Sequence, residues 1–205
     1  MQTMKAIDPQ YIEKSLSYQA YRSLVDEHLA EGKTTGPKQS EALTHYTKMN
    51  VQRMKRWDKT AKIEDELATL MTQVQEKWIW LILTEGWCGD AAHSVPVIEK
   101  LAALNPNIET RYLLRDENLP LMDQYLTNGG RSIPKLIALK ADSLEEIGTW
   151  GPRPMPAQAM MLAYKQNPEE SYEAFNIKIQ KWYSQDKGQV IQAEFKELIP
   201  LWMHR

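Results

Sequence analysis

The stretch Trp78-Ile-Trp-Leu-Ile-Leu83, followed by Thr84-Glu-Gly-Trp-Cys-Gly-Asp90, decides the fold of this chain. Its first part is continuously apolar and rich in aromatic and branched side chains, which is typical of a central strand covered on both faces. The second part is turn-like, and a helical pattern then runs from Ala91 to Leu104. A buried strand that leads into a helix in this way indicates a layered arrangement of sheet and helices.

The chain beyond this helix continues to alternate between strand and helix. We expect strands over Ile108–Leu114, Ile133–Leu139 and Glu145–Trp150, with a helix over Leu119–Leu126 between the first two. The last strand is a candidate edge strand paired with the one before it. Because alternation of this kind implies crossover connections, we predict the α/β class.

Helical patterns fill both flanks of this central region. Upstream, apolar residues recur at helical spacing from Asp8-Pro9 to about Leu29, over Glu41–Lys59 and over Glu64–Gln75. Downstream, helices are expected over Pro156–Tyr164, Pro168–Tyr183 and Gly188–Trp202. We therefore predict an N-terminal helical extension (1–62), a central α/β domain (63–165) and a C-terminal helical extension (166–205).

Composition restricts the classes of function. The chain has 205 residues, of which 42% are hydrophobic, so it can bury a sizeable core and is not expected to be disordered. A formal net charge of −2 creates no overall field that attracts nucleic acid or anionic membranes. No apolar run approaches the ~20 residues that a bilayer span needs, and the first ten residues lack the apolar segment of a secretory signal. We expect a cytoplasmic protein with no nucleic-acid or membrane partner.

Cys88 is the one cysteine in the chain, so an intramolecular disulfide is impossible. It follows a predicted strand and opens a predicted helix, where first-turn N–H groups and the helix dipole favour negative charge. We therefore expect its pKa to lie below the ~8.5 of a free thiol. Gly89 lets the chain turn tightly and lets another backbone approach the sulfur. Judged from position alone, a buried structural cysteine is the alternative.

Three further features accompany this cysteine: Trp87 directly before it, Pro96 eight positions after it, and the segment Gly130-Arg-Ser-Ile-Pro-Lys135. Together they resemble the thioredoxin superfamily, with its Trp-Cys-Gly-Pro-Cys motif, its helix-kinking proline and its cis-proline loop. The resemblance covers about residues 63–164, and it is strongest to a bacterial branch whose motif is Trp-Cys-Gly-Asp-Cys. It implies a thioredoxin-like fold, in which helices flank a central mixed sheet.

The resemblance also implies roles for individual residues. Cys88 would be the nucleophilic thiol that attacks a disulfide, and Pro134 would be the cis-proline that faces it across a shallow groove. Ile133 would offer backbone hydrogen bonds to an extended peptide, by addition of a strand. The implied partner is a protein that carries a disulfide or presents an extended peptide. The implied substrate-binding residues are Trp87, Gly89, Asp90, Ile133 and Pro134.

The departures from the family pattern bear equally on function. Ala91 stands where the family has its second cysteine, and Ile82 stands where the family buries an aspartate. Asp90 replaces the proline of the motif, and its carboxylate stabilises the helix start but opposes a neighbouring thiolate. Thiol–disulfide exchange passes through a mixed disulfide that an intramolecular thiol normally resolves. Cys88 would therefore need an external thiol.

Three functions are compatible with these residues. The first is a monothiol thiol–disulfide oxidoreductase, and the second is a redox-inactive module that binds peptides or proteins in the groove. The third is a thiol sensor, in which oxidation of Cys88 changes partner affinity. Trp87, Cys88 and Pro134 favour the first and third, whereas Ala91 and Ile82 favour the second. We expect no cofactor, with a low-molecular-weight thiol as a candidate co-substrate.

Other candidate residues are less specific. His93 lies one turn after Cys88, either to assist proton transfer or as a partly exposed polar residue. One cysteine and four scattered histidines do not suit a zinc site, so we expect no metal. The basic stretch from Lys48 to Lys62 is interpreted as a solvated helix face, with an acidic partner or nucleic acid as the alternative.

Overall fold

A four-stranded sheet lies at the centre of the computed structural model, which describes residues 5–205. Its strands are β1 (Trp78–Thr84), β2 (Ile108–Leu114), β3 (Lys135–Lys140) and β4 (Glu146–Trp150), in the order β2-β1-β3-β4. β2 runs parallel to β1, whereas β3 is antiparallel to β1 and β4 is antiparallel to β3. The mixed sheet confirms the predicted fold class, and β4 is the predicted edge strand.

β1 is the central strand that the sequence predicts. All seven of its residues are buried, because strands flank it on both sides and helices cover both faces. Trp80 pairs with Thr110 on β2 and with Ala138 on β3. The carboxyl end of β1 therefore lies beside the start of β3, and this juxtaposition positions the site described below.

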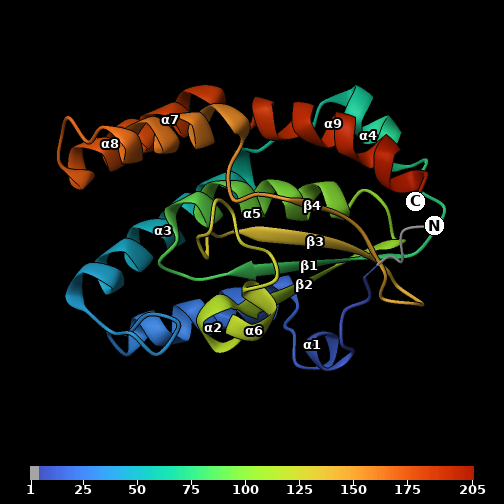
Figure 1. Ribbon diagram of the computed structural model, residues 1–205, viewed down its shortest axis with the longest axis horizontal. Coiled ribbons are helices and arrows are strands. Elements are labelled where there is room, and N and C mark those ends of the chain that lie inside the picture. Colours follow the sequence, from blue (N-terminus) through green and yellow to red (C-terminus); the bar gives the residue numbers. More distant parts are fainter. Residues whose placement is uncertain (1–4) are drawn as a thin grey trace.

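Helices form a layer on each side of the sheet (Figure 1). α1 (Gln10–Glu13), α2 (Tyr18–Ala30) and α6 (Leu119–Met122) lie on one side, with the short helix η1 (Arg115–Glu117) next to α6 in the chain. The other side carries α5 (Gly89–Ala102), α4 (Asp65–Met71) and α9 (Gln189–Met203), and α3 (Glu41–Thr60) packs along α5. The sheet is thus the middle of three layers.

Helices from both flanks share one core with the sheet. Tyr21 of α2 stacks on Tyr112 of β2, with ring centroids 5.4 Å apart. Trp80 of β1 packs against Phe195 and Trp202 of α9, at centroid distances of 5.4 and 6.0 Å. A methyl group on Gly148 of β4 would lie 1.9 Å from the Trp202 ring, so only glycine admits this tryptophan.

The remaining two helices have a core of their own. α7 (Met155–Gln166) and α8 (Tyr172–Asp186) pack together as the α7–α8 hairpin (residues 155–186). Tyr164 and Phe175 stack with centroids 4.2 Å apart inside it. In Figure 1 the hairpin (orange) lies over the N-terminal end of α5. Its buried residues are Ala157, Met161, Phe175, Ile179 and Tyr183.

The expected first helix is wrong in one respect, because the structure divides it into α1 and α2. Leu16 leaves the helical path and forms an isolated bridge with Tyr112, with the Leu16 amide 2.8 Å from the Tyr112 carbonyl. Ser17 then starts α2, and its side chain accepts a hydrogen bond from the Ala20 amide. Pairing to β2 therefore overrides local helix periodicity.

Other expected boundaries shift as well, and the helix expected over Glu64–Gln75 ends four residues early, at Met71. β3 begins at Lys135 because Pro134 has no N–H to contribute to the ladder. α6 ends at Met122, four residues early, and α8 begins at Tyr172 because Ser171 caps it. Within residues 5–205, no helix is long and apolar enough to cross a membrane.

Candidate functional site

Cys88 sits where β1 has ended and α5 begins. Its sulfur accepts a hydrogen bond from the Ala91 amide at 3.4 Å, so the side chain caps the helix. The thiol in turn donates to the Ile133 carbonyl at 3.3 Å, and the residue is only 7% exposed. The Ile133–Pro134 peptide bond is cis, as the resemblance implied. The structure thus confirms that Cys88 opens a helix and that Pro134 is a cis-proline, and the residue in hydrogen-bond contact with the sulfur is Ile133, directly before that proline.

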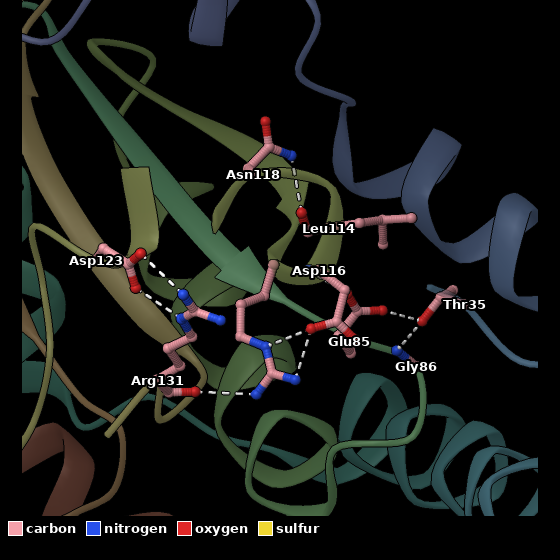
Figure 2. A network of polar contacts seen from close by, with 9 residues as sticks. Thr35, Glu85, Gly86, Leu114, Asp116, Asn118, Asp123 and Arg131 are labelled. Carbon is pink, nitrogen blue, oxygen red and sulfur yellow. Dashed lines mark hydrogen bonds and ion pairs between the residues drawn. The ribbon is translucent and has the colours of Figure 1, made fainter. Parts of the chain in front are cut away.

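Buried polar contacts anchor the turn before Cys88. The Glu85 carboxylate accepts hydrogen bonds from the Thr35 hydroxyl and, at 2.9 Å, from the Asp116 amide (Figure 2). Thr35 also accepts from the Gly86 amide at 2.8 Å, and the Asn50 side chain donates to the Gly86 carbonyl at 3.0 Å. Burial raises the pKa of Glu85 to about 7, although both of its hydrogen-bond donors act in the other direction. Residues from α3 and from the loop before it therefore fix the backbone that presents the sulfur.

Asp90 lies at the meeting point of three elements. Its carboxylate accepts a hydrogen bond from the Tyr183 hydroxyl of α8 at 2.8 Å and pairs with the Arg153 guanidinium, also at 2.8 Å. The side chains of Asp90 and Arg153 are each 12% exposed. Burial raises the pKa of Asp90, whereas Arg153 and Tyr183 lower it. This carboxylate joins the first turn of α5 to the α7–α8 hairpin and to the loop after β4.

The expected acidic thiol is wrong. Burial, together with the nearby Asp90 carboxylate, raises the pKa of Cys88 to about 12. The Ala91 amide and Arg153 act in the opposite direction but are outweighed. The sequence correctly places the sulfur at a helix N-terminus, but the tertiary contacts that bury it come from distant segments. At neutral pH Cys88 is therefore a protonated thiol.

His93 is not a partly exposed residue, nor is it free to act on the sulfur. The Trp57 indole N–H donates to its Nδ1 at 2.9 Å, so Nε2 carries the ring proton and donates to the Gln180 side chain at 2.7 Å. The Tyr183 ring stacks on the imidazole with centroids 4.4 Å apart. Burial lowers the pKa of His93 to about 4, so it is neutral at pH 7. His93, which lies on α5, therefore contacts α3 through Trp57 and α8 through Gln180 and Tyr183.

A cavity of about 360 Å³ lies in front of Cys88. Trp87, Gly89, Asp90 and Ile133 line it together with Cys88, so the structure brings five of the six predicted site residues together. Pro134 is buried and is not among the lining residues. The facing wall comes from the α7–α8 hairpin through Met161, Tyr172, Phe175, Asn176, Ile179 and Gln180.

Four arginines also line the cavity, and sequence reasoning assigned a role to none of them at this site. Arg115 directly follows β2, and Arg131 lies just before the cis bond between Ile133 and Pro134. Arg153 precedes α7, and Arg53 lies on α3. Arg131 belongs to the segment Gly130-Arg-Ser-Ile-Pro-Lys135, which was quoted for its proline, and no local motif marks the other three, which are distant from Cys88 along the chain. Arg53 does belong to the basic stretch from Lys48 to Lys62, whose five other basic residues are all exposed, whereas Arg53 is half-buried.

No metal-ligand set accompanies the cavity. Across residues 5–205, no three His, Cys, Asp or Glu side chains gather closely enough to hold a metal ion.

Comparison with known proteins identifies the type of domain. A family model described as Thioredoxin matches residues 36–172, which is most of the chain. A protein of unknown function from Pseudomonas aeruginosa has a similar structure, with a TM-score of 0.58 and 16% identity over 96% of this chain and 97% of that one. An HIV epitope-scaffold superposes with a TM-score of 0.56, at the same identity and coverage. These two structures support the fold alone. No curated protein matches the sequence.

Proposed function

Because the chain belongs to the thioredoxin family, we propose that it performs thiol–disulfide exchange with Cys88 as the nucleophile and an external thiol as the resolving partner. The observation that carries this proposal is the position of the sulfur. Cys88 opens α5, lines the cavity and faces the carbonyl of Ile133, the residue before a cis-proline. The chain has no second cysteine, so resolution must come from outside.

The exchange balances with two external sulfur compounds. The Cys88 thiolate attacks a disulfide X–S–S–R, which forms Cys88–S–S–R and releases X–S⁻. A thiolate R–S⁻ then attacks the R sulfur of the mixed disulfide, which releases the Cys88 thiolate and forms R–S–S–R. In the net reaction, X–S–S–R and one R–SH are converted to X–SH and R–S–S–R. The protein returns to its starting state without a cofactor.

Ionisation of Cys88 limits this reaction in the resting protein. The Ala91 amide and Arg153 stabilise the thiolate, whereas burial and Asp90 oppose it. Since burial is the largest cause of the raised pKa, displacement of the α7–α8 hairpin, which lines the cavity, would let water reach the sulfur and would lower that pKa. The proton of the thiol passes to water as the thiolate forms. In this account the hairpin controls when Cys88 reacts.

A redox-inactive binding module is the second candidate, and one observation favours it. A thiol with a pKa of about 12 is almost entirely protonated at neutral pH, and a thiol is a poor nucleophile. In that case the cavity would hold a peptide or small molecule, and the thiol would serve as a hydrogen-bond donor to Ile133.

Trapping of the mixed disulfide separates the two candidates. Wild-type protein treated with a small disulfide should gain the mass of one half-disulfide on Cys88, and an added thiol should remove it. Ala91→Cys places a second sulfur three residues along the same helical turn, so this variant should release the adduct without added thiol.

Ala102→Cys is the matched control, because it adds a cysteine to the same helix at a buried alanine far from the sulfur. It should leave the Cys88 adduct in place. If Cys88 takes up no adduct in either background at any pH up to 9, the protein is a binding module.

A further inference from the structure

Three of the four arginines around the cavity are neutralised by aspartates. Arg153 pairs with Asp90 at 2.8 Å, as described above. Arg115 pairs with Asp116 at 2.7 Å and Arg131 with Asp123 at 2.6 Å (Figure 2). Each of these pairs satisfies its own charge, so none of the three contributes a full positive charge to the cavity.

Arg53 is the exception. Its Nη1 atom donates to the neutral side-chain amide of Asn50 at 2.8 Å, and within residues 5–205 it makes no ion pair. The first four residues, Met-Gln-Thr-Met, add no carboxylate. The residue is half-buried, and burial lowers the pKa of its guanidinium without any compensating anion. A half-buried cation without a counter-ion favours binding of an anionic group.

The position of Arg53 relates this charge to the sulfur. A methyl group on Gly89 would lie 3.9 Å from Arg53 Nη1, so the guanidinium lies next to the residue that follows Cys88. Gly89 begins α5, where backbone N–H groups without helical partners and the helix dipole also favour negative charge. The side chain of Arg53 and the start of α5 therefore favour an anion on the same side of the cavity.

The cavity has the dimensions and lining of a small-molecule site. Its volume of about 360 Å³ lies within the range of such pockets. Leu43 and Phe175 add apolar surface, and the Trp87 ring stacks against Arg115 at 4.8 Å. The α7–α8 hairpin forms the facing wall, and the enclosed volume suits a small compound.

We propose that the R group of the exchange is a small thiol compound that carries carboxylate groups, held with one carboxylate on Arg53 and its sulfur at Cys88. This inference rests on the proposed function and specifies its resolving thiol. The anionic compound is the R–SH of that exchange: one R–SH is oxidised, its sulfur joins the R–S unit that came from X–S–S–R to give R–S–S–R, and X–SH is the reduced product. Arg53 acts as a positioning residue for this compound.

Reaction rates with disulfides of different charge test the inference. Oxidised glutathione serves as the anionic probe and bis(2-hydroxyethyl) disulfide as the neutral one. The rate of adduct formation on Cys88 is followed by mass spectrometry, and each variant is compared with wild type for the same probe. Arg53→Gln should slow the reaction of oxidised glutathione at least about tenfold, the effect expected for one charge-assisted hydrogen bond. It should leave the neutral probe unchanged within about twofold.

Two further variants make the result specific. Arg53→Lys keeps the charge and should recover much of the lost rate, whereas Arg56→Gln removes a neighbouring exposed cation outside the cavity and should have no effect. Higher salt should reduce the wild-type preference for the anionic probe.

The outcomes distinguish the two proposals. If Cys88 reacts with neither probe, the proposed function itself fails. If Cys88 reacts with both but Arg53→Gln slows them equally, or slows neither, the function stands and the anionic thiol is wrong.

Discussion

The sheet core and the α7–α8 hairpin differ in what holds them in place. The core unites both flanking layers through large aromatic contacts, such as Trp80 with Phe195 and Trp202. The hairpin has its own small core and reaches α5 through polar and stacking contacts, in particular Tyr183 with Asp90 and Gln180 with His93. We therefore expect the free energy of unfolding to depend mainly on the sheet core, and access to Cys88 to depend on the contacts of α8.

Removing the central aromatic of the sheet core should have the largest effect. Trp80 is fully buried, and its loss leaves a cavity between β1 and α9. We expect Trp80→Ala to lower the free energy of unfolding by roughly 3–5 kcal/mol, measured by urea denaturation. A loss below about 1 kcal/mol would show that β1 is not the centre of stability.

Removing an aromatic from the hairpin core should act locally. Phe175 stacks on Tyr164 within the small core, and because this core is separate from the sheet core, we expect it to open while the sheet stays folded. We expect Phe175→Ala to speed amide exchange across residues 155–186 while the amides of β1 keep their protection. Alkylation of Cys88 should become faster, because burial is the main cause of its raised pKa. Equal loss of protection in the hairpin and in β1 would mean that the two regions form one cooperative unit.

The smallest change in this series concerns the charge beside the sulfur. Asp90 raises the pKa of Cys88, so Asp90→Asn should lower that pKa. In wild type the alkylation rate should rise about tenfold per pH unit between pH 7 and 10, since the thiolate fraction grows in that proportion below the pKa. The variant should react roughly tenfold faster at pH 8, the effect of a shift of one pKa unit.

Asp142→Asn is the control for this substitution, because it changes an exposed aspartate in the turn between β3 and β4. It should match wild type at every pH. A wild-type rate that levels off below pH 8.5 would instead restore the acidic thiol that the sequence suggests.

Local patterns in the sequence were sufficient to predict the strand β1 and the start of α5. The apolar run from Trp78 to Leu83 has one plausible place in a sheet, and the motif around Cys88 places the sulfur at a helix N-terminus. The electrostatics of the site were not predictable in this way. Tyr183 reaches Asp90 across a separation of 93 residues, and no local pattern encodes that contact.

The break between α1 and α2 has the same kind of cause. Leu16 leaves its helix to pair with Tyr112, a residue that is near it only once the sheet has formed. Arg53 was visible in the sequence as one basic residue among several, and only burial distinguishes it from its neighbours on α3. Short-range signals thus specified the elements, while long-range contacts determined the chemistry.

Turnover with an external thiol tests the central claim most directly. A mixed disulfide between a small neutral thiol and glutathione is supplied with excess glutathione, and the formation of oxidised glutathione is followed at pH 8. We predict many turnovers per protein molecule, with complete loss of the catalysed rate in Cys88→Ser and a rate that rises in Asp90→Asn. A Cys88→Ser variant that turns over as fast as wild type would contradict the account.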